Sequence, residues 1–330
     1  MAHLLRGLAA DGGIRVVAAD TSDLVADAAA RHGTSATASA ALGRTLTAAA
    51  LLSHVLLKHP RDRVTVRLDG GGPLGGIIAE AGLDGEVRGY VLNPDTELAP
   101  RTDGKLDVGG AVGSRGQIEV IRSHAPYGDP FTSSVQLVSG EVAEDVAAFL
   151  AQSEQIASAV LLGVYVGPDG VETVGGVLLQ ALPEAEPAAL DLLEANVGSY
   201  GQLTHGLRRT GLLAVMHELT WGLEMQQMTD VALPLRFGCR CSDEAALQAL
   251  AYFPPHERAR MMAEDGGAEA VCHWCGKRRW FGPAAIDSLA DGAAEVRCPD
   301  CATLWYRDAG TVMVRDGELC ACGRPVRLPN

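Results

Sequence analysis

The placement of cysteine constrains this chain more than any other sequence feature. All eight cysteines lie at or beyond position 239, and the first two-thirds of the chain has none. The first four, called here the first quartet, form a C-x-C pair at Cys239 and Cys241 and a C-x-x-C pair at Cys272 and Cys275. Two such knuckles can present four thiolates to one soft metal, and Zn²⁺ is the usual occupant of a tetrahedron of sulfurs. We therefore predict a zinc site that helps to fold its own segment.

A second quartet repeats this theme in reverse order, with C-x-x-C at Cys298 and Cys301 followed by C-x-C at Cys320 and Cys322. Its spacing predicts a second zinc site. Spacing alone leaves the pairing open. Each quartet could hold its own metal, or the first C-x-C pair could share a metal with Cys298 and Cys301 in a cross-braced arrangement.

Charge and hydropathy favour a cytoplasmic protein that binds neither nucleic acid nor a membrane. Residues 234–330 carry 12 Lys and Arg against 13 Asp and Glu, which leaves 15 against 28 for residues 1–233. An acidic body lacks the clustered cations that nucleic-acid binding requires. The start of the chain lacks the long apolar core of a signal peptide, and the longest apolar run, residues 46–57, is too short to span a bilayer. Thiols stay reduced in the cytoplasm, so clustered cysteines there favour metal binding or redox sensing.

Hydrophobic periodicity predicts an α+β fold with a mixed or antiparallel sheet. Residues 34–58 form the longest helical pattern, with a broad apolar stripe, and residues 63–69 alternate as a half-buried strand. Turns at Asp84-Gly85 and at residues 167–170 join strands into hairpins, which argues against a doubly wound parallel sheet. We expect an α+β core domain over 1–183, a helical linker over 184–233, a zinc-thiolate domain over 234–292 and a ribbon-like extension with four cysteines over 293–330.

Two features favour a redox switch over a purely structural ribbon. Cationic side chains near the first quartet stabilise thiolates and raise their reactivity toward oxidants; they are Arg240, Lys277, Arg278 and Arg279. Cysteines so close in the chain can also close disulfides locally. Oxidation would then expel the metal and remove its folding energy, which is on the order of 10–16 kcal/mol.

Rival functions come from other classes. A constitutive zinc ribbon would bind nucleic acid or a fixed protein partner, and the near-neutral C-terminal part leaves room for it. A thiol-disulfide oxidoreductase would use a C-x-x-C motif, but Cys272 lacks a thioredoxin-like βαβ context. The glycine run at residues 70–76 lacks the G-K-[ST] ending of a phosphate loop, and Ser153-Glu154-Gln155 has no nucleophile placed beside it. We expect no enzyme.

Five short stretches follow one another along the chain: residues 36–46 (ATASAALGRTL), 72–76 (GPLGG), 87–91 (VRGYV), 138–145 (VSGEVAED) and 153–159 (SEQIASA). Their order and spacing resemble the heat shock protein 33 family of redox-regulated holdase chaperones. The C-x-C and C-x-x-C pairs follow them, and the resemblance covers residues 4 to about 290. The family pattern normally ends there, so the second quartet departs from it.

The resemblance implies an ATP-independent cytoplasmic chaperone that is silent when reduced and zinc-bound. The first quartet would hold the zinc, and oxidation would join Cys239 to Cys241 and Cys272 to Cys275. The linker would then loosen, and a homodimer would bind unfolded or oxidatively damaged client proteins through exposed apolar surface. Methionine adapts well to irregular apolar partners. The linker residues that fit client binding are Leu212, Met216, Leu219, Trp221, Leu223, Met225 and Met228.

Overall fold

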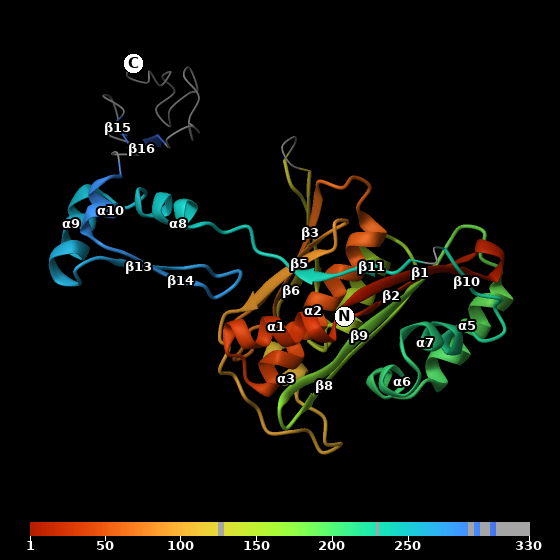
Figure 1. Ribbon diagram of the computed structural model, residues 1–330. Coiled ribbons are helices and arrows are strands. Elements are labelled where there is room, and N and C mark those ends of the chain that lie inside the picture. Colours follow the sequence, from red (N-terminus) through yellow and green to blue (C-terminus); the bar gives the residue numbers. More distant parts are fainter. Residues whose placement is uncertain (125–128, 229–230, 290–293, 298–303, 308–330) are drawn as a thin grey trace. The chain divides into compact units, whose positions relative to one another are not determined.

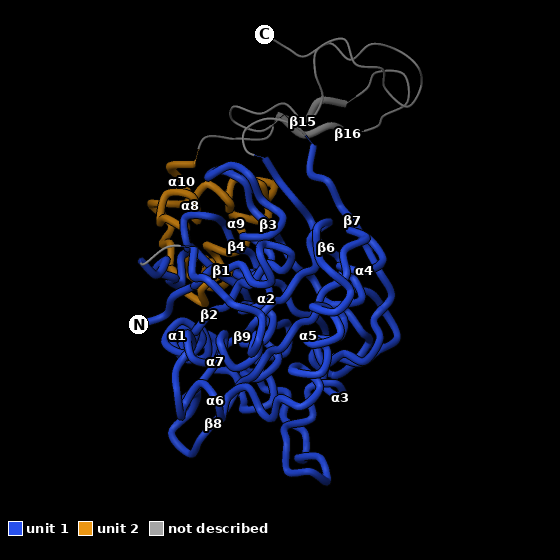
Figure 2. The backbone as a smooth tube through the Cα atoms, turned by 90° about the vertical axis from the view of Figure 1, so that its right-hand side faces the viewer, with its two compact units in different colours: residues 1–239 blue, residues 240–330 orange. Residues whose placement is uncertain are grey.

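The structure, a computed structural model, describes residues 1–330 except 125–128, 229–230, 290–293, 298–303 and 308–330 (Figure 1). For residues 294–297 and 304–307 only the backbone is described. The chain divides into two compact units, Met1–Cys239 and Arg240–Asn330 (Figure 2). The division falls inside the first C-x-C pair.

Two six-stranded sheets form the first unit, and the fold is mixed α+β. The first sheet has the order β10-β1-β2-β9-β8, with β11 also paired to β1. The second sheet has the order β12-β5-β4-β3-β6-β7. The strands of the first sheet are β1 (His3–Ala9), β2 (Ile14–Asp20), β8 (Ser158–Gly167), β9 (Gly170–Ala181), β10 (Gln226–Gln227) and β11 (Leu233–Pro234). Those of the second are β3 (Asp62–Asp69), β4 (Ile77–Gly82), β5 (Glu86–Val91), β6 (Gln117–His124), β7 (Phe131–Gln136) and β12 (Arg236–Phe237).

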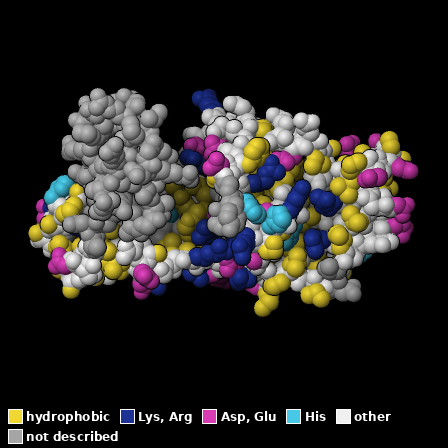
Figure 3. Space-filling view, turned by 90° about the horizontal axis from the view of Figure 1, so that it is seen from above, with side chains coloured by type: hydrophobic (Ala, Val, Ile, Leu, Met, Phe, Trp, Pro, Cys, Tyr) yellow, Lys and Arg dark blue, Asp and Glu magenta, His cyan; other side chains and the backbone are white. Residues whose placement is uncertain are grey.

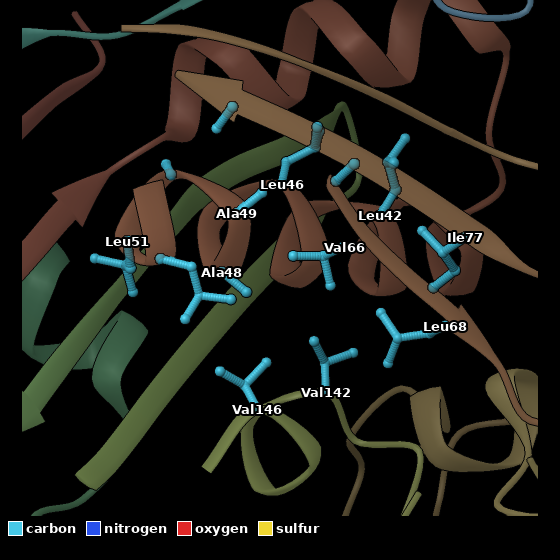
Figure 4. Packing of buried hydrophobic residues seen from close by; sticks show 14 of the residues in the cluster. Leu42, Leu46, Ala48, Ala49, Leu51, Val66, Leu68, Ile77, Val142 and Val146 are labelled. Carbon is cyan, nitrogen blue, oxygen red and sulfur yellow. The ribbon is translucent and has the colours of Figure 1, made fainter. Parts of the chain in front are cut away.

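Helix α2 (Ala36–Leu56) lies between the two sheets and contacts strands of both. Its apolar residues Leu42 and Leu46 share one core with Val66 and Leu68 of β3 and with Ile77 of β4 (Figure 4). The sequence predicts a single apolar stripe, but 16 of the 21 residues of α2 are buried. A helix between two sheets has no solvent face, and it is buried all round.

Small side chains allow this close packing. A Cβ atom on Gly43 of α2 would lie 2.9 Å from Val25 and 3.0 Å from Val164, so glycine lets both neighbours approach. Threonine hydroxyls in the buried helix donate to the preceding turn, Thr45 to the Ala41 carbonyl at 2.9 Å and Thr47 to Gly43 at 2.7 Å. Their polar groups are therefore satisfied inside an apolar environment.

Three further helices flank this core, namely α1 (Ser22–His32), α3 (Val108–Val112) and α4 (Ala143–Gln152). Asp145 fixes the start of α4. Its buried carboxylate accepts hydrogen bonds from the backbone N–H groups of Val138 at 2.7 Å, Ser139 at 3.1 Å and Val142 at 2.9 Å. Residues 138–145 therefore form one structural unit, because the Asp145 carboxylate joins the loop before α4 to the first turn of that helix.

The opposite face of the first sheet is covered by α5 (Pro187–Ser199), α6 (Leu203–Thr210) and α7 (Leu212–Leu219). Together they enclose a second core, separate from the one around α2. Sheet residues such as Ile14 and Leu179 meet Leu207 and Met216 of the helices there. The helical character expected for much of residues 184–228 is confirmed, but Met225 and Met228 lie beyond the last helix, where the chain turns into β10.

The second unit contains α8 (Asp243–Leu250), α9 (Pro255–Glu264), β13 (Ala268–Val271), β14 (Arg278–Phe281) and α10 (Pro283–Asp287), then a two-stranded sheet of β15 (Ala294–Arg297) and β16 (Leu304–Arg307). In its described part, a small cluster of Leu250, Ala268, Ile286 and Leu289 forms the core. So few buried side chains stabilise a segment only marginally without a further constraint.

Histidine 54, near the end of α2, makes the stability of the first unit depend on pH. Both of its ring nitrogens are buried without a hydrogen-bond partner. Burial, and secondly the charge of Arg6, lower the pKa of His54 to about 4. In the unfolded chain the pKa would be near 6.5, so between these values the unfolded state binds more protons. Keeping the ring neutral costs no free energy of unfolding above pH 6.5. As the pH falls from 6.5 toward 4, protonation of the unfolded chain lowers the free energy of unfolding.

We predict that the free energy of unfolding falls by about 2.5 kcal/mol more in the native protein than in His54→Phe when the pH drops from 7.5 to 4.5. Urea unfolding followed by circular dichroism at the two pH values measures this difference. Other titrating groups cancel because both proteins contain them. Parallel losses of stability in the two proteins would show that His54 does not resist protonation.

Candidate metal centre

The first knuckle follows directly from the second sheet. Strand β12 pairs in parallel with β5, and the Gly238 N–H donates to the Val87 carbonyl at 3.0 Å. Cys239 is the next residue. After Cys241, the Ser242 hydroxyl accepts a hydrogen bond from the Ala245 N–H at 2.9 Å and caps α8. The C-x-C pair is therefore held between a strand and a helix start.

The second knuckle is the loop of the hairpin between β13 and β14. The Cys272 N–H donates to the Lys277 carbonyl at 3.0 Å, and the Gly276 N–H donates to the Cys272 carbonyl at 2.8 Å. Gly276 has φ of +68°, a left-handed conformation that glycine adopts without strain. The turn reverses the chain directly after Cys275 and leads into β14.

The four sulfurs of the first quartet come together. Their Sγ atoms all lie within 4.8 Å of one another, and Cys241 and Cys275 are 3.5 Å apart. A tetrahedron with Zn–S bonds of about 2.3 Å has S–S edges of about 3.8 Å. Cys275 is buried and the other three are half-buried. A closed set of four soft donors is the chemistry of a structural zinc site, and these residues fit that metal.

Arg279 lies directly beside the sulfurs. Its Nη2 donates to the Cys241 Sγ at 3.2 Å, and its Nε donates to the Asp243 carboxylate at 2.6 Å. The guanidinium is buried, while its neighbour Arg278 is exposed and pairs with Glu269 at 3.1 Å. One of the four cations expected near the quartet thus contacts a ligand sulfur, and Lys277 is 3.5 Å from Asp243.

These charges shift two pKa values in a consistent direction. The hydrogen bond from Arg279, followed by the charge of Lys277, lowers the pKa of Asp243. Asp243, and after it Cys241, raise the pKa of Arg279. Arginine 279 therefore stays charged beside the Cys241 sulfur, where it favours thiolate over thiol. Asp243 was not recognised from the sequence, although its place in the first turn of a helix directly after C-x-C is a usable signal.

We predict that Arg279→Met weakens zinc binding by the first quartet roughly 10- to 100-fold, the usual effect of losing a partner of a metal ligand. Competition with a chromophoric chelator measures the affinity. The matched control is Arg278→Met, which removes a cation of equal charge from the adjacent, exposed position and should leave the affinity unchanged. Equal losses in both variants would mean that general charge, and not the contact with Cys241, supports the site.

The predicted client-binding residues divide into two groups. Trp221 is 75% exposed and Met228 is 53% exposed. The other five are buried in the core between the first sheet and α5–α7; they are Leu212, Met216, Leu219, Leu223 and Met225. The structure therefore brings most of the predicted set together as one covered apolar layer. The second quartet, Cys298, Cys301, Cys320 and Cys322, lies outside the described residues.

In the described part of the chain, no helix is long and apolar enough to cross a membrane.

Comparison with known proteins places these features in a family. The model of the family described as Hsp33 protein matches residues 2–282. A 33 kDa chaperonin of Thermus thermophilus is 51% identical, and the match covers 100% of this chain and 98% of that protein. A 33 kDa chaperonin of Deinococcus radiodurans is 49% identical over 88% of this chain and 99% of its own length.

A solved structure agrees with these matches. The crystal structure of the 33 kDa chaperonin (heat shock protein 33 homolog) from Thermotoga maritima has a TM-score of 0.78 and 32% identity, and covers 86% of this chain and 96% of that one. The family match ends at residue 282, before the second quartet, whereas the Thermus relative matches the full chain. Sequence, fold and structural likeness agree, and the chain belongs to the Hsp33 family.

Proposed function

We propose that this protein is an ATP-independent chaperone that holds unfolding proteins and is switched on by oxidation of the first cysteine quartet. The observation that carries the proposal is the covered apolar layer between the first sheet and α5–α7, in the same chain as a cluster of four cysteines. Relatives named 33 kDa chaperonin share the sequence over most or all of its length. In the reduced state the layer is covered and the chaperone is silent.

The chain between the apolar layer and the quartet is held by short pairings. Strands β10, β11 and β12 have two residues each. The Met228 N–H donates to the Arg6 carbonyl at 2.8 Å, and the Leu235 N–H donates to Ala2 at 3.0 Å. Hydrogen bonds of this kind contribute about 1 kcal/mol each. Leu235 is the one buried residue in the described part of 226–238, and Leu233 and Phe237 pack beside it. A segment with so few anchors can separate from the sheets once the structure that follows it is lost.

Oxidation would remove that structure. Two thiolates of one pair give two electrons to a peroxide, which takes up two protons and leaves as two molecules of water, and an S–S bond forms between the sulfurs. We propose that Cys239 pairs with Cys241 and Cys272 with Cys275. A disulfide sulfur is no longer a thiolate ligand, so the quartet releases zinc and the folding energy of the site is lost. The linker then loosens, and the active form is a homodimer.

The same chemistry bears on the cellular compartment of the protein and on the proteins that it binds. Silent, reduced thiols require a reducing compartment, so we place the protein in the cytoplasm. Clients are unfolded or oxidatively damaged proteins, which expose the apolar segments that the uncovered layer would bind. No turnover of a substrate is involved, and neither nucleic acid nor a membrane is needed.

Aggregation of a chemically unfolded client, followed by light scattering, tests the proposal. Protein kept reduced with zinc should leave aggregation unchanged, and peroxide-treated protein from which zinc has been removed should suppress it. Equal suppression in both states would contradict a redox switch.

Charge distribution gives little support to the rival function, a constitutive nucleic-acid or protein-binding ribbon. In Figure 3, Lys, Arg and His side chains gather on one part of the first unit, with Asp and Glu side chains among them. In the described part of the second unit, Arg260 lies 3.9 Å from Glu264 and Arg278 lies 3.1 Å from Glu269. Cations neutralised by nearby carboxylates release few counterions on binding a phosphate backbone. Salt-dependent binding of DNA or RNA by the full chain would favour the rival.

For the second quartet we propose a second zinc. Native mass spectrometry of the reduced protein should then give a mass with two zinc ions. One zinc per chain would leave the first quartet as the sole site, and the order in which peroxide removes two zincs would identify the sensing quartet.

A further inference from the structure

In the described part of the chain, the first sheet has an open edge at β8. Strand β8 is the last strand of that sheet, and among the described residues it pairs with β9 alone (Figure 1). It is ten residues long, with the sequence SAVLLGVYVG, and it contains neither a charged residue nor proline. Natural proteins usually protect long edge strands with charges, proline or a covering element. An edge that lacks charges and proline can accept another strand.

The register shows which backbone groups are available. The Ala181 N–H donates to the Ala157 carbonyl at 3.0 Å, and this pairing continues along β8 and β9 as far as a bulge after Tyr165. Hydrogen bonding alternates along an antiparallel strand. Odd-numbered residues of β8 therefore bond to β9, and the N–H and C=O groups of Val160, Leu162 and Val164 point to the open edge. Three such residues in alternation can pair with an extended segment of about five residues.

Both faces of β8 pack in part on apolar cores, and its residues are half-buried except for the exposed Tyr165. Val160 and Leu162 pack on the core around α2, whereas Leu161 packs on the core beneath the linker helices. A groove of about 600 Å³ runs along the strand. Besides β8 itself, it is lined by residues 103–106, by parts of α2 and α4, and by residues 201–204.

The groove favours an extended polypeptide over other partners. It contains two cations, Arg44 and Lys105, and two carboxylates, Asp103 and Glu144, so its charges balance. Lys105 is 3.8 Å from Asp103, and Arg44 pairs with Glu141. Recognition must then rely on main-chain hydrogen bonds and apolar contacts, which many sequences can supply. An extended segment supplies both kinds of contact through its backbone and its alternate side chains, so it fits this groove better than a partner that depends on charge complementarity.

We propose that the edge of β8 binds extended segments of unfolded proteins by adding them to the first sheet as a further strand. This inference rests on the proposed holdase function and names a binding element for it. The edge depends on β9 and α2 for its position, so it persists when the linker loosens.

Residue-resolved amide exchange by ¹⁵N NMR tests the proposal on the peroxide-treated full chain. The probe is reduced, carboxymethylated α-lactalbumin, which stays unfolded without denaturant. At saturating probe, the amides of Val160, Leu162 and Val164 should exchange roughly tenfold more slowly, because exchange then occurs mainly from the unoccupied fraction. The amides of Leu161 and Gly163, already bonded to β9, should change little.

A variant provides the second readout. Val160→Pro removes one outward N–H and leaves the bonds to β9 intact, so it should weaken probe binding roughly five- to tenfold. Val160→Ala, which shortens the side chain but keeps the N–H, is the matched control and should bind almost as well as the native protein.

Several results would overturn the proposal. Unchanged exchange at the three amides while the probe co-sediments would reject the edge and leave the holdase function standing, and absence of probe binding would reject both. Protection before probe is added would mean that the edge is already occupied. Such protection would indicate a second copy if it depends on protein concentration, and another segment of this chain if it does not.

Discussion

Changing Cys275 to Ser should abolish zinc binding by the first quartet and unfold the segment around it. Cys275 is the buried member of the four, and a serine hydroxyl is a hard, protonated group that does not replace a thiolate. The apparent binding energy of a structural zinc is on the order of 10–16 kcal/mol. The small core around Leu250 and Ile286 cannot offset a loss of that size. Zinc analysis, together with limited proteolysis of residues 240–289, measures both effects.

The matched control is His273→Ala, which alters the same loop without removing a sulfur. It should retain zinc and resist protease as the native protein does. If His273→Ala loses the metal as well, the ligand set is not the four sulfurs. If Cys275→Ser keeps its zinc and its resistance to protease, the quartet is not what folds this segment.

Leu219→Asp should turn the reduced, zinc-loaded protein into an active holdase. Leu219 is completely buried in the layer between α7 and the first sheet. Losing the leucine contacts and burying a carboxylate there together cost about 3–5 kcal/mol or more, which favours release of the helix. Helix α7 should leave the sheet, and suppression of client aggregation should rise from none to near the level of the peroxide-treated protein.

Leu213→Asp is the control on the same helix. Leu213 is 40% exposed, so an aspartate there remains in water and α7 stays in place. Reduced Leu213→Asp should therefore be silent. The account fails if Leu219→Asp opens the linker to protease yet remains silent, since the uncovered layer would then not be the surface that binds clients.

The fold was largely predictable for elements that have one buried face and one solvent face. The half-buried strand β3 alternates apolar and polar residues and is found as predicted. Strand β1 was missed, because His3, Arg6 and Gly7 obscure its pattern and its pairing with β2 and with β10 and β11 is what makes it a strand. Helix α2 was predicted as a helix, but a local pattern cannot show that sheets lie on two of its sides.

The clustering of the first quartet was predictable from its spacing, whereas the side chains around it were harder to predict. Two cysteines so close in the chain can bind the same metal ion, so their spacing predicts where their sulfurs meet. The structure brings the sulfurs of the first quartet within 4.8 Å of one another. Asp243 could not be assigned in the same way, because its importance arises from Arg279, 36 residues further along the chain. The open edge of β8 was also beyond the sequence, since it depends on which strand ends the sheet.

The most direct test of the central claim is a titration of the reduced, zinc-loaded protein with peroxide, in which zinc release and suppression of client aggregation are measured on the same samples. The account predicts that the two rise together, and that reductant with added zinc reverses both. Suppression that reaches its full level while the first quartet still holds zinc, or complete zinc release without suppression, would contradict it.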